Sequence, residues 1–230
     1  MSAQSLQPMA TSLRVLGALL TYPDARMRGH LPEMRELLRA ENALTPERLS
    51  ELDALMESLQ LADPLDSEAI YVELFDRGRA TSLHLFEHVH GDSRERGPAL
   101  IDLGQTYEKA GLILAEGELP DFLPAVLEFV STQPPAEAKA FLGEMAHIYN
   151  AIFGALLQRN SAYACVLGAL LELAGEVAQP IKPAAEDALD ESWAEPVVFD
   201  GCSSKGQTQP IHVIRTAKTA KANPSSGVVA

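Results

Sequence analysis

Three histidines and a glutamate stand close together near the middle of the chain, at a spacing with which side chains can hold a metal ion. His84, Glu87 and His88 form the pattern H-x-x-E-H, and His90 follows two residues later. Two histidines one helical turn apart can bind zinc, and a neighbouring glutamate can act as a general base toward a bound water molecule. The pattern is therefore compatible with zinc-dependent peptide hydrolysis.

A zinc peptidase needs more than this short pattern. It needs a third protein ligand, an open coordination position and a sheet edge that aligns the substrate, and the sequence indicates none of these. The sequence also has no glycine-rich phosphate loop, no nucleophile elbow and no paired-cysteine motif. A structural alternative is a polar helix face whose histidines form hydrogen bonds with neighbouring carbonyls or carboxylates. We therefore expect no enzyme and no metal.

The histidines lie within a longer stretch, Tyr71 to Leu112, that is rich in charge. It holds three histidines, seven carboxylates and four arginines, which are Arg77, Arg79, Arg94 and Arg96. The arginines could pair with carboxylates such as Glu87 and Asp92 and fix the loops around the histidines. Alternatively, they could offer an anion site to the phosphate of a cofactor.

Helical periodicity runs through most of the chain, and no segment shows the alternation or the Val/Ile/Thr enrichment of a strand. The sequence therefore predicts an all-α fold. Helices are expected over 13–20, from about Pro32, from Thr45 to Asp63, from Asp66 or Ser67 through Phe75, and over Ala80–His90. A further helix is expected to reach Leu114, and a start at Pro98 is favoured over a start at a capping box formed by Asp92 and Glu95. Others are expected after Asp121 as N-cap, from Pro135 to Leu157, and after Ser161 as N-cap.

The expected helix over Ala80–His90 would carry the candidate metal ligands. On a helical wheel, Leu85, Phe86 and Val89 fall on one side, and His84, Glu87 and His88 fall on the other. Gly91 is placed to end this helix with a positive φ. The last expected helix carries a single charge, Glu172, and is predicted to lie at the centre of the bundle or to face a partner.

The composition is that of a globular protein, with 47% hydrophobic and 22% charged residues. A net charge of -14 opposes binding to nucleic acid and favours a basic partner, although acidity can also serve solubility alone. The apolar N-terminal run lacks the basic start of a secretory signal. Cys165 and Cys202 lie in unlike surroundings, so no disulfide framework is expected. We expect a cytoplasmic protein without membrane insertion.

The periodicity ends near Gly175, which predicts a helical domain over residues 1–175 and a tail over residues 176–230. The tail is divided electrically: residues 176–200 hold seven acids and one lysine, and residues 201–230 hold four bases and no acid. The apolar residues around Trp193 could dock on the domain as an extended clasp, or the tail could be disordered.

A longer pattern through the centre of the chain connects these motifs. ELFDRGRATSLHLFEHVHGDSRERG (residues 73–97), then YEKAGL (107–112) and ELPDFLPAVLEFV (118–130), resembles the nitrate reductase delta-subunit (NarJ) family, within the TorD-like group of molybdoenzyme assembly chaperones. The resemblance extends from the first helix to about Gly175. In the tail, WAEPVVFDGC and QPIHVIR are also similar to segments of close relatives.

The resemblance implies an all-α, single-domain helical bundle that acts as a cytoplasmic chaperone without catalytic activity. Such proteins bind the N-terminal segment of the apo α (catalytic) subunit of nitrate reductase, permit molybdenum cofactor insertion and delay membrane attachment. They are absent from the finished enzyme and bind no cofactor permanently. Proteins of molybdenum cofactor biosynthesis are further expected partners. A zinc peptidase and a general helical adaptor remain the alternatives.

Capture of a basic, amphipathic peptide helix would require an apolar groove with an acidic rim. We expect some of the carboxylates Asp76, Glu87, Asp121 and Glu128 to meet basic residues of the partner, while aromatic and aliphatic neighbours line or support the groove. The candidate partner-binding residues are Tyr71, Phe75, Asp76, Arg77, His84, Phe86, Glu87, His88, Tyr107, Asp121, Leu127 and Glu128. For each aromatic residue taken alone, core packing is the competing interpretation.

Overall fold

The most apolar helix of the chain lies at the centre of the fold. The computed structural model describes residues 8–91 and 93–179, and in it ten of the eleven residues of α11 (Ala164–Ala174) are buried. This helix packs against α1 (Ala10–Leu19), α4 (Pro46–Leu61), α9 (Pro135–Glu144) and α10 (Ala146–Gln158). The prediction of a central last helix is confirmed, because a helix that is apolar on all sides must be buried on all sides.

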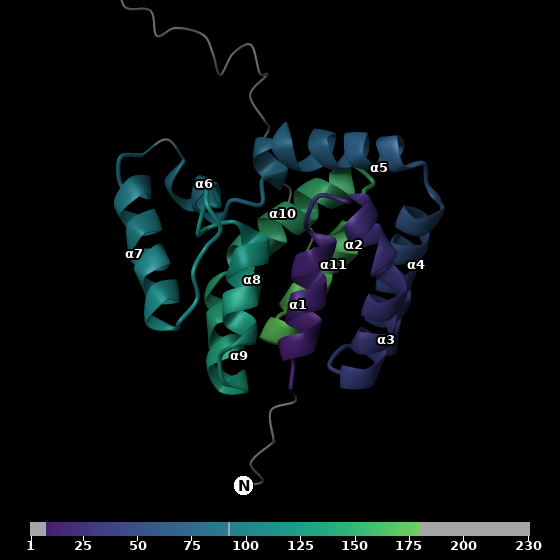
Figure 1. The fold of residues 1–230 in the computed structure, drawn as a ribbon, viewed down its shortest axis with the longest axis horizontal. Coiled ribbons are helices and arrows are strands. Elements are labelled where there is room, and N and C mark those ends of the chain that lie inside the picture. Colours follow the sequence, from purple (N-terminus) through teal and green to yellow (C-terminus); the bar gives the residue numbers. More distant parts are fainter. Residues whose placement is uncertain (1–7, 92, 180–230) are drawn as a thin grey trace, which may run out of the picture. The chain divides into compact units, whose positions relative to one another are not determined.

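The other helices surround this centre (Figure 1). α1 also packs against α3 and α8, and α3 packs against α4. The remaining elements are α2 (Ala25–Gly29), α3 (Leu31–Glu41), α5 (Pro64–Tyr71), the π-helix η1 (Val72–Asp76), the 3-10 helix η2 (Arg79–Thr81), α6 (Leu85–His90), α7 (Arg96–Lys109) and α8 (Leu123–Ser131). Every α-helix contributes a buried side chain to one core, and the described part of the chain contains no strand. The all-α, single-domain prediction is confirmed.

Side-chain hydrogen bonds at the N-cap explain where α4 and α5 begin. The Thr45 hydroxyl accepts a hydrogen bond from the Arg48 N–H at 3.4 Å, as predicted for the cap of α4. The prediction of Asp66 or Ser67 as the cap of α5 is wrong. Asp63 caps this helix through the Leu65 N–H at 2.9 Å, because Pro64 suits the first helical position.

The single long helix predicted from Pro135 to Leu157 is also wrong. The chain forms two helices, α9 and α10, that meet at an angle of 60°. Met145 separates them, with a φ of −90° and a ψ of −2°. Both helices still contribute to the core, α9 through Ala138 and Leu142 and α10 mainly through Ile148, Tyr149 and Ile152. Gly143, a weak helix former, is the local signal that precedes the break.

Helix α5 runs directly into the π-helix η1, where each backbone hydrogen bond spans one residue more than in an α-helix. The Arg77 N–H bonds to the Val72 carbonyl at 3.1 Å, five residues back. The carbonyls of Glu73 and Leu74 accept from side chains outside the helix: Arg159 Nη1 donates to Glu73 at 3.3 Å, and the Thr81 hydroxyl donates to Leu74. These contacts hold the chain as it turns out of η1.

Gly78 permits this turn because no Cβ would fit there. A methyl group at this position would lie 2.8 Å from the Leu74 carbonyl oxygen and would also overlap the Thr81 hydroxyl. The first of these is backbone and cannot move away cheaply. Glycine is therefore required at residue 78 by close packing.

Few of the predicted tail residues belong to the described part of the chain. Ala178 packs against the core, and the Gln179 N–H donates to the Asn150 side-chain oxygen at 2.9 Å. Residues 180–230, with Trp193 and the charge division, lie outside the described residues. Across 8–91 and 93–179, no single helix is long and apolar enough to cross a membrane; the bent pair α9 and α10 meets the criteria of length and composition only.

We expect Gly78→Ala to lower the free energy of unfolding by about 1–3 kcal/mol, the usual cost of forcing extra atoms into a packed site. Gly104→Ala is the matched control, because it lies inside α7 with nothing within 4 Å of an added Cβ. That change should be neutral or stabilising, since alanine favours helix. Urea unfolding of both variants measures the difference, and equal stabilities would contradict the role given to Gly78.

Candidate functional site

The buried carboxylate of Asp121 joins two segments that are far apart in sequence. Its side chain is 0% exposed, and Oδ2 accepts the Phe86 N–H at 3.1 Å. Its own carbonyl accepts the Leu85 N–H at 3.0 Å. The first N–H groups of a helix have no partner within the helix, and the N-cap residue of α6, His84, makes no side-chain bond to them. Asp121 supplies the missing acceptors from a distant part of the chain. The prediction that Asp121 caps α8 is wrong, since Phe122 stands at that position.

The segment before α6 is extended, so the predicted helix over Ala80–His90 is wrong in its first half. The Leu123 N–H donates to the Leu83 carbonyl at 2.8 Å, and His84 forms an isolated antiparallel bridge with Phe122. The rings of His84 and Phe122 lie 5.4 Å apart. The backbone of residues 83–85 is therefore bonded to residues 121–123 and is not available for a helix at residues 83 and 84. Helix α6 is accordingly restricted to Leu85–His90.

The side chains of the H-x-x-E-H pattern point to separate partners. His84 Nδ1 lies 3.3 Å from Asp121 Oδ1, and His88 Nε2 lies 2.8 Å from the Ser82 carbonyl. Glu87 accepts from Arg96 instead. Among the residues that the structure describes, no group of three His, Cys, Asp or Glu side chains is placed to hold a metal ion. The geometry thus favours the structural interpretation of the pattern over a zinc site.

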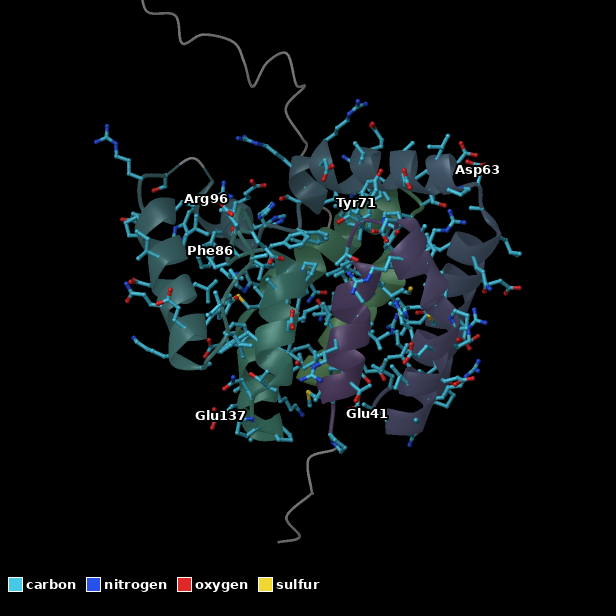
Figure 2. The ribbon with its side chains drawn as sticks, in the orientation of Figure 1. Glu41, Asp63, Tyr71, Phe86, Arg96 and Glu137 are labelled. Carbon is cyan, nitrogen blue, oxygen red and sulfur yellow. The ribbon has the colours of Figure 1, made fainter. Side chains whose placement is uncertain are left out.

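Arg96, the first residue of α7, links the two carboxylates of this cluster. Its Nη2 lies 3.2 Å from Glu87 Oε1 and 3.8 Å from Asp121 Oδ2. Figure 2 shows Phe86 and Arg96 on the α6 and α7 side of the bundle. The predicted pairing of an arginine with Glu87 is confirmed for Arg96, whereas Arg77 pairs with Glu73 at 3.1 Å. Asp92 lies outside the described residues.

The contact between His84 and Asp121 shifts the pKa values of both groups. Burial would raise the pKa of Asp121, but the bonds from His84 and the Phe86 N–H and the charge of Arg96 hold it below its ordinary value of 3.8. The hydrogen bond to Asp121 raises the pKa of His84 above 6.5, although partial burial opposes the increase. Both shifts favour the charged pair, which locks the start of α6 to the segment before α8.

The other predicted site residues fall into three groups. Tyr71, Phe75, Tyr107 and Leu127 are core residues, at most 5% exposed, as the competing core interpretation predicted. The Tyr71 hydroxyl donates to the Leu20 carbonyl and that of Tyr107 to the Pro120 carbonyl, both at 2.8 Å.

Asp76 and Arg77 are exposed at the end of η1, and Glu128 is exposed on α8. Phe86 is half-buried. Val89, expected to face inward, is 52% exposed.

An open groove of about 570 Å³ runs along α5 and η1 and was not predicted from the sequence. Leu65, Ile70 and Val72 line it, together with Tyr22 from the loop between α1 and α2. The signal in the sequence was a second apolar row at Leu65, Ala69 and Val72, separate from the inward row. This groove and the Asp121 cluster are the two candidate sites of the described chain.

Stability should fall as pH rises through neutrality, because His84 contributes most when protonated. A raised pKa gives a contribution that is complete below about pH 6.5 and disappears above the folded-state pKa. Asp121 acts in the opposite direction, and its contribution disappears only in strong acid. Urea unfolding between about pH 5.5 and about 8.5 should show a loss of less than about 1 kcal/mol, since the His84 side chain is 33% exposed.

The variant His84→Gln should remove that loss and flatten the stability profile over the same pH range. In an Asp121→Asn background, the same substitution should alter the pH dependence no further, because the charged partner is already absent. A wild-type profile identical to that of His84→Gln would show that this pair does not stabilise the fold.

Comparisons with known proteins agree with the family resemblance. The nitrate reductase delta subunit family model matches residues 30–165. The nitrate reductase molybdenum cofactor assembly chaperone NarJ of Escherichia coli strain K12 is 45% identical over 193 residues, which cover 80% of this chain and 82% of that protein. The "Probable nitrate reductase molybdenum cofactor assembly chaperone NarW" of the same strain is 39% identical over 193 residues, or 80% of each chain.

A solved structure shares the fold. The crystal structure of a candidate redox enzyme maturation protein from Archaeoglobus fulgidus superimposes with a TM-score of 0.52 at 20% identity, over 73% of this chain and 94% of that one. The relatives with higher sequence identity are named as assembly chaperones, which confirms the expectation that this chain has no catalytic role. On the family match and these identities, the chain belongs to the nitrate reductase delta subunit family and is an assembly chaperone, not an enzyme.

Proposed function

We propose that this chain assembles respiratory nitrate reductase by binding the N-terminal segment of the apo α (catalytic) subunit in the cytoplasm. It holds the subunit in a state that accepts the molybdenum cofactor before membrane attachment, and it is not part of the finished enzyme. The observation that carries this proposal is the 45% identity to NarJ over 80% of this chain and 82% of that protein.

The geometry supports a binding role. The polar residues of the Asp121 cluster bond to one another and to backbone groups, so they act as a scaffold. A net charge of -14 suits a basic client, and exposed apolar side chains such as Leu65 and Ile70 suit an amphipathic one. No cofactor has to bind this chain for that role, since the molybdenum cofactor is delivered to the client.

The sequence-predicted residues enter this proposal in two ways. Asp76, Arg77, Glu87, His88 and Glu128 are exposed or half-buried, as are the neighbouring Phe86 and His84, so these side chains are accessible at the surface. Tyr71, Phe75, Tyr107, Asp121 and Leu127 are buried, and they act by supporting the surface above them. Accessible residues can therefore form the binding surface, and buried residues can stabilise it from within.

Calorimetry with a synthetic peptide of the nitrate reductase α subunit N-terminus tests the proposal. The full chain should bind it, and affinity should fall as salt rises, because an acidic surface attracts a basic helix. A peptide of the same composition in scrambled order should not bind. Absence of heat with the native peptide from mildly acidic to neutral pH would refute the proposal.

A second peptide separates the chaperone from a general helical adaptor. An unrelated amphipathic helix of equal length and charge should bind at least about tenfold more weakly than the α-subunit peptide, a difference of about 1.4 kcal/mol. Equal affinities would instead favour the general adaptor.

A further inference from the structure

Exposed apolar side chains gather along the outer side of α5 and η1. Leu65 is 74% exposed, Ile70 is 54% exposed, and Tyr22 at the groove edge is 44% exposed. With Ala69 and Val72 they line the open groove of about 570 Å³. A surface helix ordinarily turns polar residues outward, so this concentration of exposed apolar side chains indicates a binding surface.

The fold itself does not require this outer row. The same helical segment packs onto the core through another face, formed by Ser67, Tyr71, Leu74 and Phe75, all at most 7% exposed. Two apolar faces on one short segment exceed what core packing needs. The outer row is therefore available to a partner.

Carboxylates border the groove on the same segment. Residues 62–77 contain five Asp or Glu residues and one Arg, Arg77, which also lines the groove, so the rim carries a net negative charge. Glu68 accepts from the Tyr22 hydroxyl at 2.9 Å, and Glu73 pairs with Arg77 while its side chain remains 65% exposed. An apolar floor with an acidic rim fits a helix that carries one apolar stripe and basic flanks.

The groove is formed in advance by packing beneath it. Tyr71 packs edge-to-face against Tyr22 and at a tilt against Phe75, with ring centroids 5.7 and 4.9 Å apart, and Phe75 contacts Tyr163 edge-to-face at 5.2 Å. The Tyr71 hydroxyl bond to Leu20 fixes this group to the end of α1. A surface that is already ordered loses less conformational entropy on binding, which favours affinity.

We propose that the groove along α5 and η1, rather than the α6 and α8 surface, seats the apolar face of the client's basic amphipathic helix. This inference rests on the proposed function and adds the location. A second copy of the chain is a poor occupant, because a symmetric contact would bring two acidic rims together. A basic client removes that repulsion. The basic flanks of the helix meet Glu68 and Glu73.

Four substitutions of exposed apolar residues test the location by calorimetry with the α-subunit N-terminal peptide. Leu65→Ser and Ile70→Ser should each weaken binding about tenfold. Leu61→Ser on α4 and Ile101→Ser on α7 are the matched controls, at 79% and 61% exposed, and should stay within about twofold of wild type. All four should keep the wild-type melting temperature, since none of these side chains is buried.

The charge of the rim is tested by a second pair of variants. Glu73→Gln should reduce the salt dependence of peptide binding, whereas Glu128→Gln on α8 should leave it unchanged, although both residues are exposed. The reverse result would place the client on the α6 and α8 surface.

The outcomes separate the location from the function. If wild-type protein does not bind the peptide, both the proposed function and the location fail. If wild type binds and Leu65→Ser and Ile70→Ser bind equally well, the function stands and the location is overturned. Size-exclusion chromatography adds one further outcome: groove variants that change the oligomeric state but not peptide affinity would make the groove a contact between copies and would also overturn the location.

Discussion

The buried carboxylate of Asp121 is the interaction on which the polar half of this fold depends. A buried carboxylate is costly unless every lone pair finds a donor, and here His84, the Phe86 N–H and Arg96 supply donors or opposite charge. Through these bonds, one residue caps α6, fixes the extended segment before it and draws in the start of α7. Charged contacts among His84, Glu87, Arg96 and Asp121 therefore hold the segment around α6 in place. His84 has a structural role in this arrangement.

A second set of contacts fixes the segment on the other side of Gly78. Thr81 and Arg159 bond to the carbonyls at η1, while the core side of α5 rests on an aromatic group. The inward side of α5 and η1 is thus fully engaged, and the outward side keeps an apolar floor and an acidic rim. This division between an ordered inner face and an open outer face suits a chaperone, which must be folded before its client arrives and must later release it. A preformed and shallow groove serves both requirements.

The sequence predicted what depends on local chemistry and periodicity, including the all-α class, the Thr45 cap, the central position of α11 and the pairing of an arginine with Glu87. It failed where distant backbone decides the outcome. His84 lies outside the helix because its neighbours Leu83 and Leu85 bond to backbone groups 40 and 36 positions away, and no periodicity within residues 80–90 records that. The apolar pattern continues across Met145, so periodicity alone does not record the bend between α9 and α10. The groove was not predicted because α5 and η1 carry two apolar rows, and the sequence does not indicate which of the two faces the core.

Hydrogen–deuterium exchange of the full chain, with and without the α-subunit N-terminal peptide, tests the central claim most directly. Helix amides slow their exchange when a partner stabilises the helix that carries them. If the client helix lies in the groove, the peptide should slow exchange over residues 64–76 and leave α8 and α9 unchanged. Protection confined to α6, α7 and α8, with none over residues 64–76, would contradict this account.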